Sequence, residues 1–291
     1  MSAINIIPEI LLMPIIAALL ASVTCGLVGT LTVVRRDTYV AGTVSHSILA
    51  GLGFSQFALT VLRWEWFTPA VGAITATIAT AIIIVLFRIN NERQDTALSA
   101  IWSVGMAIGL LFMAFSPGYQ SDLFNYMFGT ILLVSKNDII TMIVLNTIIL
   151  LCIMLCWRGI LAVCFNYETA KLRGVNVILF ESALSIVTAL SIVLLVRIMG
   201  VVLAVALLAL PAMSACRISK RLFTIMFLTA VITAVSIISG LIISYLTDLP
   251  PSALTVTIAA IFVIIASIIK RIQFISKRRT DVTNPIPSVH T

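Results

Sequence analysis

Charged side chains are scarce in this sequence, and their scarcity indicates the class of protein. Only 10% of the 291 residues are charged and 61% are hydrophobic, whereas roughly a quarter of the residues in a soluble domain are charged. A chain with so little charge lacks the polar surface that a soluble protein needs. The sequence therefore predicts an integral membrane protein, and we expect no nucleic-acid partner.

Several motifs that carry chemistry are also missing. No G-x-x-x-x-G-K-[ST] loop and no Gly-Lys pair occurs, no H-E-x-x-H zinc motif is present, and the five cysteines form no C-x-x-C pair. Any ATP must therefore be bound by a partner, and we expect no bound cofactor and no catalytic residue in this chain. Ser45 and His46 are neighbours, which places them about 100° apart on a helix and unable to act as a nucleophile and base.

Long apolar runs are abundant and set the fold class. A hydrocarbon core of about 30 Å needs roughly 20 apolar residues in a helix, and the runs do not alternate as the strands of a barrel do. The sequence predicts an all-α polytopic membrane protein with about nine transmembrane helices. They lie near residues 11–34, 39–60, 68–87, 97–116, 139–157, 177–196, 198–216, 222–246 and 252–269.

Two further segments complete the predicted organisation. Residues 122–138 have an apolar centre of about 13 residues, too short to cross, so they are expected to form a re-entrant or interfacial helix. We expect residues 1–270 to form the transmembrane domain. Residues 271–291 are polar and are expected to form a cytoplasmic tail.

The distribution of basic residues predicts the orientation. In a nine-span arrangement, 15 of the 18 lysines and arginines fall on one side, and only Arg63, Lys136 and Arg197 fall on the other. Short basic loops stay on the cytoplasmic side of a membrane. The N-terminus is therefore predicted to be outside and the C-terminus in the cytoplasm.

The segment FNYETAKLRGVN, residues 165–176, predicts a two-turn helix on the cytoplasmic surface. Asn166 can cap it, Glu168 lies in its first turn, Lys171 and Arg173 lie in its last turn, and Gly174 can end it, so that each charge complements the helix dipole. One interpretation is an ordinary interfacial connector. The other is a docking surface for a cytoplasmic partner.

His46 is the candidate for chemistry inside the membrane, because the only other histidine, His290, lies in the polar tail. It follows Thr38 by eight residues, or about 12 Å along a helix, which places it near the bilayer midplane. An ionisable residue at that depth is a functional candidate. Gly42 and Gly53 lie on or near the same face, so a neighbouring helix can approach closely. The alternative is a neutral histidine that hydrogen-bonds across helices.

Four stretches, in order, resemble one family. They are VVRRDTYVAGTVSHSILAG, QDTALSAIWSVGMAIGLL, SPGYQSDLFNYMFGTILLVSKND, and NYETAKLRGV followed by MGVVLAVALLALPAMSA. The chain resembles, over roughly residues 10–270, the permeases of the bacterial ABC-type zinc, manganese and iron importers.

This resemblance implies a permease subunit of an ATP-driven importer of a divalent metal ion, a homodimer or heterodimer in the bacterial inner membrane. It implies an extracytoplasmic metal-binding protein and two cytoplasmic ATPase subunits as partners, so that the chain itself is not an enzyme. Glu168, Ala170 and Gly174 match the helix that couples to the ATPase, and His46 matches the histidine that meets the metal as a transient ligand. Gly42 stands where the family usually has an aspartate.

Two other hypotheses stay open from the residues alone. One is a secondary metal transporter or channel that works without an ATPase, and the other is an intramembrane enzyme. An ATPase that co-purifies with the chain separates the first hypothesis from the importer, and catalytic turnover by the isolated chain favours the second.

Overall fold

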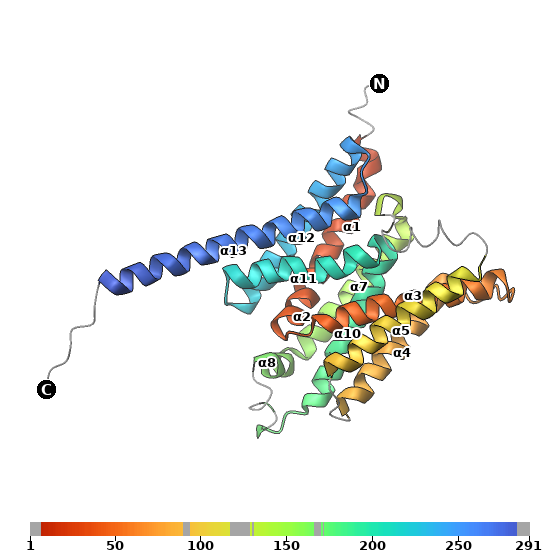
Figure 1. Ribbon diagram of the computed structural model, residues 1–291, viewed down its shortest axis with the longest axis horizontal. Helices are drawn as coiled ribbons and strands as arrows, with labels where there is room; N and C mark the ends of the chain where they lie inside the picture. The colour runs from red at the N-terminus through yellow and green to blue at the C-terminus, as the bar shows by residue number, and fades with distance from the viewer. Residues whose placement is uncertain are drawn as a thin grey trace.

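The chain folds into a bundle of long helices (Figure 1). The computed structural model describes residues 7–89, 94–116, 129, 131–165, 170 and 172–283, and these residues contain no strand. In chain order the elements are α1 (Ile7–Thr24), η2 (Cys25–Gly29), α2 (Thr30–Val34), α3 (Thr38–Thr60), α4 (Pro69–Ile89), α5 (Gln94–Ala114), η3 (Ile131–Leu133), α7 (Lys136–Leu155), α8 (Trp157–Phe165), α10 (Val177–Met199), α11 (Val201–Ile218), α12 (Leu222–Thr247) and α13 (Pro251–Thr283).

The predicted all-α polytopic fold is confirmed. Within the described residues, eight helical segments are long and apolar enough to cross a membrane. The first of them, Leu11–Val34, runs through α1, the π-helical turn η2 and α2. Helix α3 adds a further 23-residue helix whose serines, threonines, glycines and histidine lower its hydropathy. The helices therefore agree with the expected number of about nine spans.

Helices α3, α4 and α5 pack as one unit, drawn in orange to yellow in Figure 1. Small residues allow their backbones to approach closely: Gly51 of α3 faces Gly72 of α4, and Gly53 of α3 faces Gly109 of α5. A Cβ atom on Gly51 would overlap the carbonyl oxygen of Gly72. The polar helix α3 is thus held by two neighbours inside the protein.

Several buried hydroxyl groups of α3 are satisfied within the bundle. Thr43 donates to the carbonyl oxygens of Tyr39 at 2.9 Å and of Leu98 on α5 at 3.0 Å, and Ser47 donates to the carbonyl of Thr43 at 2.8 Å. Buried polar groups need such partners, since an unmade hydrogen bond in an apolar interior costs free energy. These bonds make a polar helix compatible with the apolar core.

The outer helices present apolar side chains to their surroundings. On α4, Ile74, Ile78, Ile82 and Leu86 are all about half exposed. Their spacing of four residues places them in one stripe along the helix. An exposed stripe of large apolar residues is the surface expected of a helix in contact with lipid.

The last three spans form the other side of the bundle, whereas α10 packs against α3 and α4. Helix α11 packs against α12 and α13, and also against η2 and α2 of the first span. Helix α13 extends beyond the bundle in Figure 1 and continues past Lys270 to Thr283. Most of the predicted tail up to residue 283 is therefore helical, and residues 284–291 lie outside the described residues.

About half of the segment 122–138, predicted to be re-entrant or interfacial, lies outside the described residues. Its described end contains the short turn η3 and the start of α7, where Ser135 and Asp138 form a capping box. Asp138 also pairs with Arg197 at the end of α10, with 3.1 Å between the carboxylate oxygen and the guanidinium nitrogen. This ion pair holds the start of α7 against the end of α10.

Candidate functional site

His46 lies in the middle of α3, where the ring stacks on the indole of Trp102 from α5. The two ring centroids are 4.6 Å apart and the planes differ by 14°. Helices α3 and α5 run in the same direction, because Gly42 meets Trp102 and, farther along both helices, Phe54 meets Phe112. The close approach that the glycines of α3 predicted is confirmed by these contacts.

One ring nitrogen of the His46 imidazole is buried without a hydrogen-bond partner among the described residues. That nitrogen is Nδ1, and the buried hydroxyl oxygen of Ser45 is in the same situation. The interpretation of His46 as a residue that hydrogen-bonds across helices therefore finds no support at Nδ1. A buried nitrogen with a free lone pair or proton is instead available to a ligand.

A cavity of about 390 Å³ adjoins the indole of Trp102. Its walls come from α2, α3, α5 and α11, and consist of Thr32, Thr38, Tyr39, Ala41, Gly42, Trp102, Val205, Leu208 and Ala209. Trp102 lines the cavity, whereas His46 is not among its lining residues. The cavity therefore lies beside the N-terminal end of α3, and the Trp102 indole of α5 forms part of its wall.

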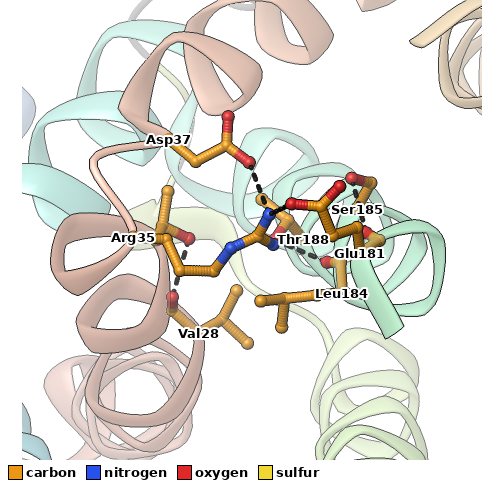
Figure 2. Close-up of polar contacts among 8 residues, drawn as sticks. Val28, Arg35, Asp37, Glu181, Leu184, Ser185 and Thr188 are labelled. Carbon is orange, nitrogen blue, oxygen red and sulfur yellow. Dashed lines mark hydrogen bonds and ion pairs between the residues drawn. The ribbon is translucent and has the colours of Figure 1, made fainter. Parts of the chain in front are cut away.

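A buried charge cluster lies near the same end of α3, as Figure 2 shows. The Arg35 guanidinium is 2.9 Å from the Glu181 carboxylate of α10 and 3.5 Å from the Asp37 carboxylate. The three side chains are 8%, 15% and 18% exposed, in the order Arg35, Glu181 and Asp37. The cluster joins the chain between α2 and α3 to the first turns of α10.

This cluster was not predicted from the sequence. Arg35 is one of the 15 basic residues on the predicted cytoplasmic side, and Glu181 lies about one turn inside an apolar run. Burial of a charge is costly unless it is paired. The sequence signal for this cluster was a carboxylate one turn inside an apolar span, Glu181, together with two adjacent arginines at the end of another span, Arg35 and Arg36.

The predicted cytoplasmic helix is described only at its end. Glu168 lies outside the described residues, whereas Ala170 is 2% exposed and packs with Val163 and Val177. Gly174 has a φ of 76°, and the Val175 amide donates to the Ala170 carbonyl at 3.1 Å. A left-handed glycine followed by this hydrogen bond is a Schellman motif, as expected if Gly174 ends a helix.

The described residues hold no fixed multi-ligand metal site. No group of three or more histidine, cysteine, aspartate or glutamate side chains among them is placed to hold a metal ion. His46 is therefore a single candidate ligand and not a member of a cage. A single imidazole binds a divalent ion weakly, and weak binding suits a residue that a transported ion passes.

Comparison with known proteins identifies membrane transport proteins as relatives of this chain. The profile of the ABC 3 transport family matches residues 8–270. A probable metal transport system membrane protein of Chlamydia pneumoniae is 36% identical over 245 residues, which cover 84% of this chain and 83% of the relative. The high-affinity zinc uptake system membrane protein ZnuB of Haemophilus influenzae is 28% identical over 266 residues, 90% of this chain and 98% of the relative.

A solved structure agrees with the fold. The structure described as PsaBC from Streptococcus pneumoniae in complex with Fab is 27% identical, with a TM-score of 0.76. The match covers 88% of this chain and 90% of the solved one. Because the family profile spans nearly all the described helices and the solved relative shares their arrangement, this chain belongs to the ABC 3 transport family.

Proposed function

We propose that this chain is the membrane-spanning subunit of an ATP-driven importer of a divalent metal ion (zinc, manganese or iron), with His46 as a transient ligand. The observation that carries the proposal is the buried Nδ1 atom of His46, which has no partner among the described residues and lies on the central helix α3. Neutral imidazole binds zinc, iron and manganese. Transport needs a ligand that also releases the ion, and one imidazole meets that need.

The partners follow from what the chain lacks. It has no phosphate-binding loop, so ATP hydrolysis belongs to cytoplasmic ATP-binding subunits, which we propose to dock at the segment containing Glu168, Ala170 and Gly174. A second permease subunit, identical or related, completes the path. An extracytoplasmic metal-binding protein delivers the ion on the outer face of the bacterial inner membrane.

Uptake measurements test the proposal directly. Cells with and without the gene are given zinc, manganese or iron as separate radiolabelled ions, and the uptake of each is compared. We expect gene-dependent uptake of at least one ion and co-purification of an ATP-binding subunit with the chain. Gene-dependent uptake that persists without any ATPase would favour a secondary transporter instead.

The orientation gives a second test. Because 15 of the 18 basic residues fall on one side of a nine-span arrangement, we expect an external N-terminus and a cytoplasmic C-terminus. Reporter proteins fused at Met1 and at Thr291 should therefore report opposite sides of the membrane. Reporters on the same side would mean an even number of spans.

Gly174 tests the docking segment. Replacing it with valine forces a β-branched residue into a φ of 76°, at a cost of about 1–2 kcal/mol. No atom lies within 4 Å of a Cβ placed there, so the effect comes from the backbone alone. We expect Gly174→Val to weaken ATPase association and ATP-dependent uptake while membrane insertion persists.

The matched control for that variant is Gly174→Asn, because asparagine tolerates the left-handed conformation. It should retain ATPase association and uptake close to the original protein. Equal uptake by the valine and asparagine variants, both at the original level, would contradict a docking role for this helix end.

A further inference from the structure

Trp102 contacts both the cavity and His46. The indole is part of the cavity wall, and its ring stacks on the imidazole with 4.6 Å between centroids. A divalent ion with six water ligands occupies roughly 180 Å³, at about 30 Å³ for each water. The cavity, at about 390 Å³, has room for such an ion. The imidazole face beneath the indole has none.

Gly42 creates the space that the indole occupies. A Cβ atom at this position would lie 2.7 Å from Cζ3 of Trp102, which is closer than two carbon atoms approach. Any larger residue would therefore push the indole away from its place over His46. The absence of a side chain at Gly42 and the stack between Trp102 and His46 are two parts of one arrangement.

We propose that Trp102 is the gate of the His46 site: its indole covers the imidazole in this conformation and moves aside when a divalent ion passes between His46 and the cavity. This proposal rests on the proposed function of His46 as a ligand. The indole and imidazole planes lie nearly parallel, so the indole shields one face of the ring from water and hydrated ions. Displacement of one side chain exposes that face without any movement of the helices.

The accessibility of the His46 imidazole can be measured directly, because the chain contains only two histidines, His46 and His290. Diethyl pyrocarbonate modifies accessible neutral imidazoles, and mass spectrometry measures each site separately. In the full chain, assembled with its partners in membrane vesicles, His290 serves as the internal reference. The quantity to measure is the modification rate of His46 divided by that of His290.

Removal of the indole should expose the imidazole. We expect Trp102→Ala to raise the ratio about 2- to 10-fold, the population change that corresponds to the stacking energy of an aromatic pair. Phe112→Ala is the matched control, since Phe112 lies on the same helix and packs on Phe54 and Phe57 of α3 rather than on His46. The control should leave the ratio unchanged.

A second variant keeps the indole in the chain. Gly42→Ala displaces Trp102 sterically, so it should also raise the ratio, and it should add nothing when combined with Trp102→Ala, because both changes remove the same cover. An unchanged ratio in Trp102→Ala, or in Gly42→Ala if the first variant does not assemble, overturns the gate.

The test of the Trp102 gate and the test of the His46 ligand role can fail independently. Modification of His46 is measured without any transported metal. If Trp102→Ala raises the ratio while His46→Ala leaves transport intact, the indole shields the histidine but the ligand role is wrong. If His46→Ala stops transport while neither Trp102→Ala nor Gly42→Ala changes the ratio, the ligand role stands and the gate is wrong.

Discussion

Replacing His46 with alanine is expected to lower metal uptake about tenfold or more for each assembled complex, the scale of loss when a group that supports metal binding is removed. The imidazole is the candidate ligand on α3, and its buried Nδ1 atom has no partner among the described residues. Alanine keeps the helix intact. Assembly with the ATP-binding subunits and their basal ATPase activity should persist.

Ser45→Ala is the matched control for this variant. Its hydroxyl is also buried and without a partner among the described residues, but it points about 100° away from the imidazole. Uptake of radiolabelled metal, divided by the amount of assembled complex, should be normal in Ser45→Ala. A normal value in His46→Ala as well would exclude the ligand role, and a loss of protein abundance in proportion to uptake would identify a structural histidine.

Replacing Arg35 with methionine is expected to destabilise the protein by about 3–5 kcal/mol, the cost of breaking a buried ion pair. The guanidinium is 2.9 Å from the Glu181 carboxylate and 3.5 Å from that of Asp37. Its removal takes the positive charge away from two largely buried carboxylates. Glu181→Gln should cost less, because the amide oxygen can still accept a hydrogen bond from Arg35 and Asp37 remains nearby.

Arg36→Met supplies the control for this comparison. Arg36 is adjacent in the sequence, but it is exposed, and exposed charges contribute little to stability. The measurement is the thermal unfolding midpoint of the purified protein in detergent. The order of destabilisation should be Arg35→Met, then Glu181→Gln, then Arg36→Met. If the Arg36 variant is as unstable as the Arg35 variant, burial of the charge cluster does not account for the loss of stability.

Some features of the site were accessible from the sequence because they depend on local pattern. The place of His46 inside a long helix followed from the length of an apolar run, and the residue lies within α3. The stop at Gly174 followed from charges and a glycine within a few residues, and its φ of 76° agrees. The small residues of α3 predicted a close neighbour, and α5 is that neighbour.

Other features needed the tertiary structure. Nothing local to Trp102 indicates that its indole lies over His46, and Glu181 is 146 residues from the arginine that it pairs with. Such contacts depend on which helices are adjacent and on how each is rotated about its axis. In lipid, apolar side chains facing a helix and those facing the bilayer are alike in hydropathy. The sequence by itself therefore determined the all-α membrane fold, the approximate spans and the place of the histidine within a long helix. Only packing among the helices decided what covers that histidine and which charges meet, because packing depends on shape and not on hydropathy.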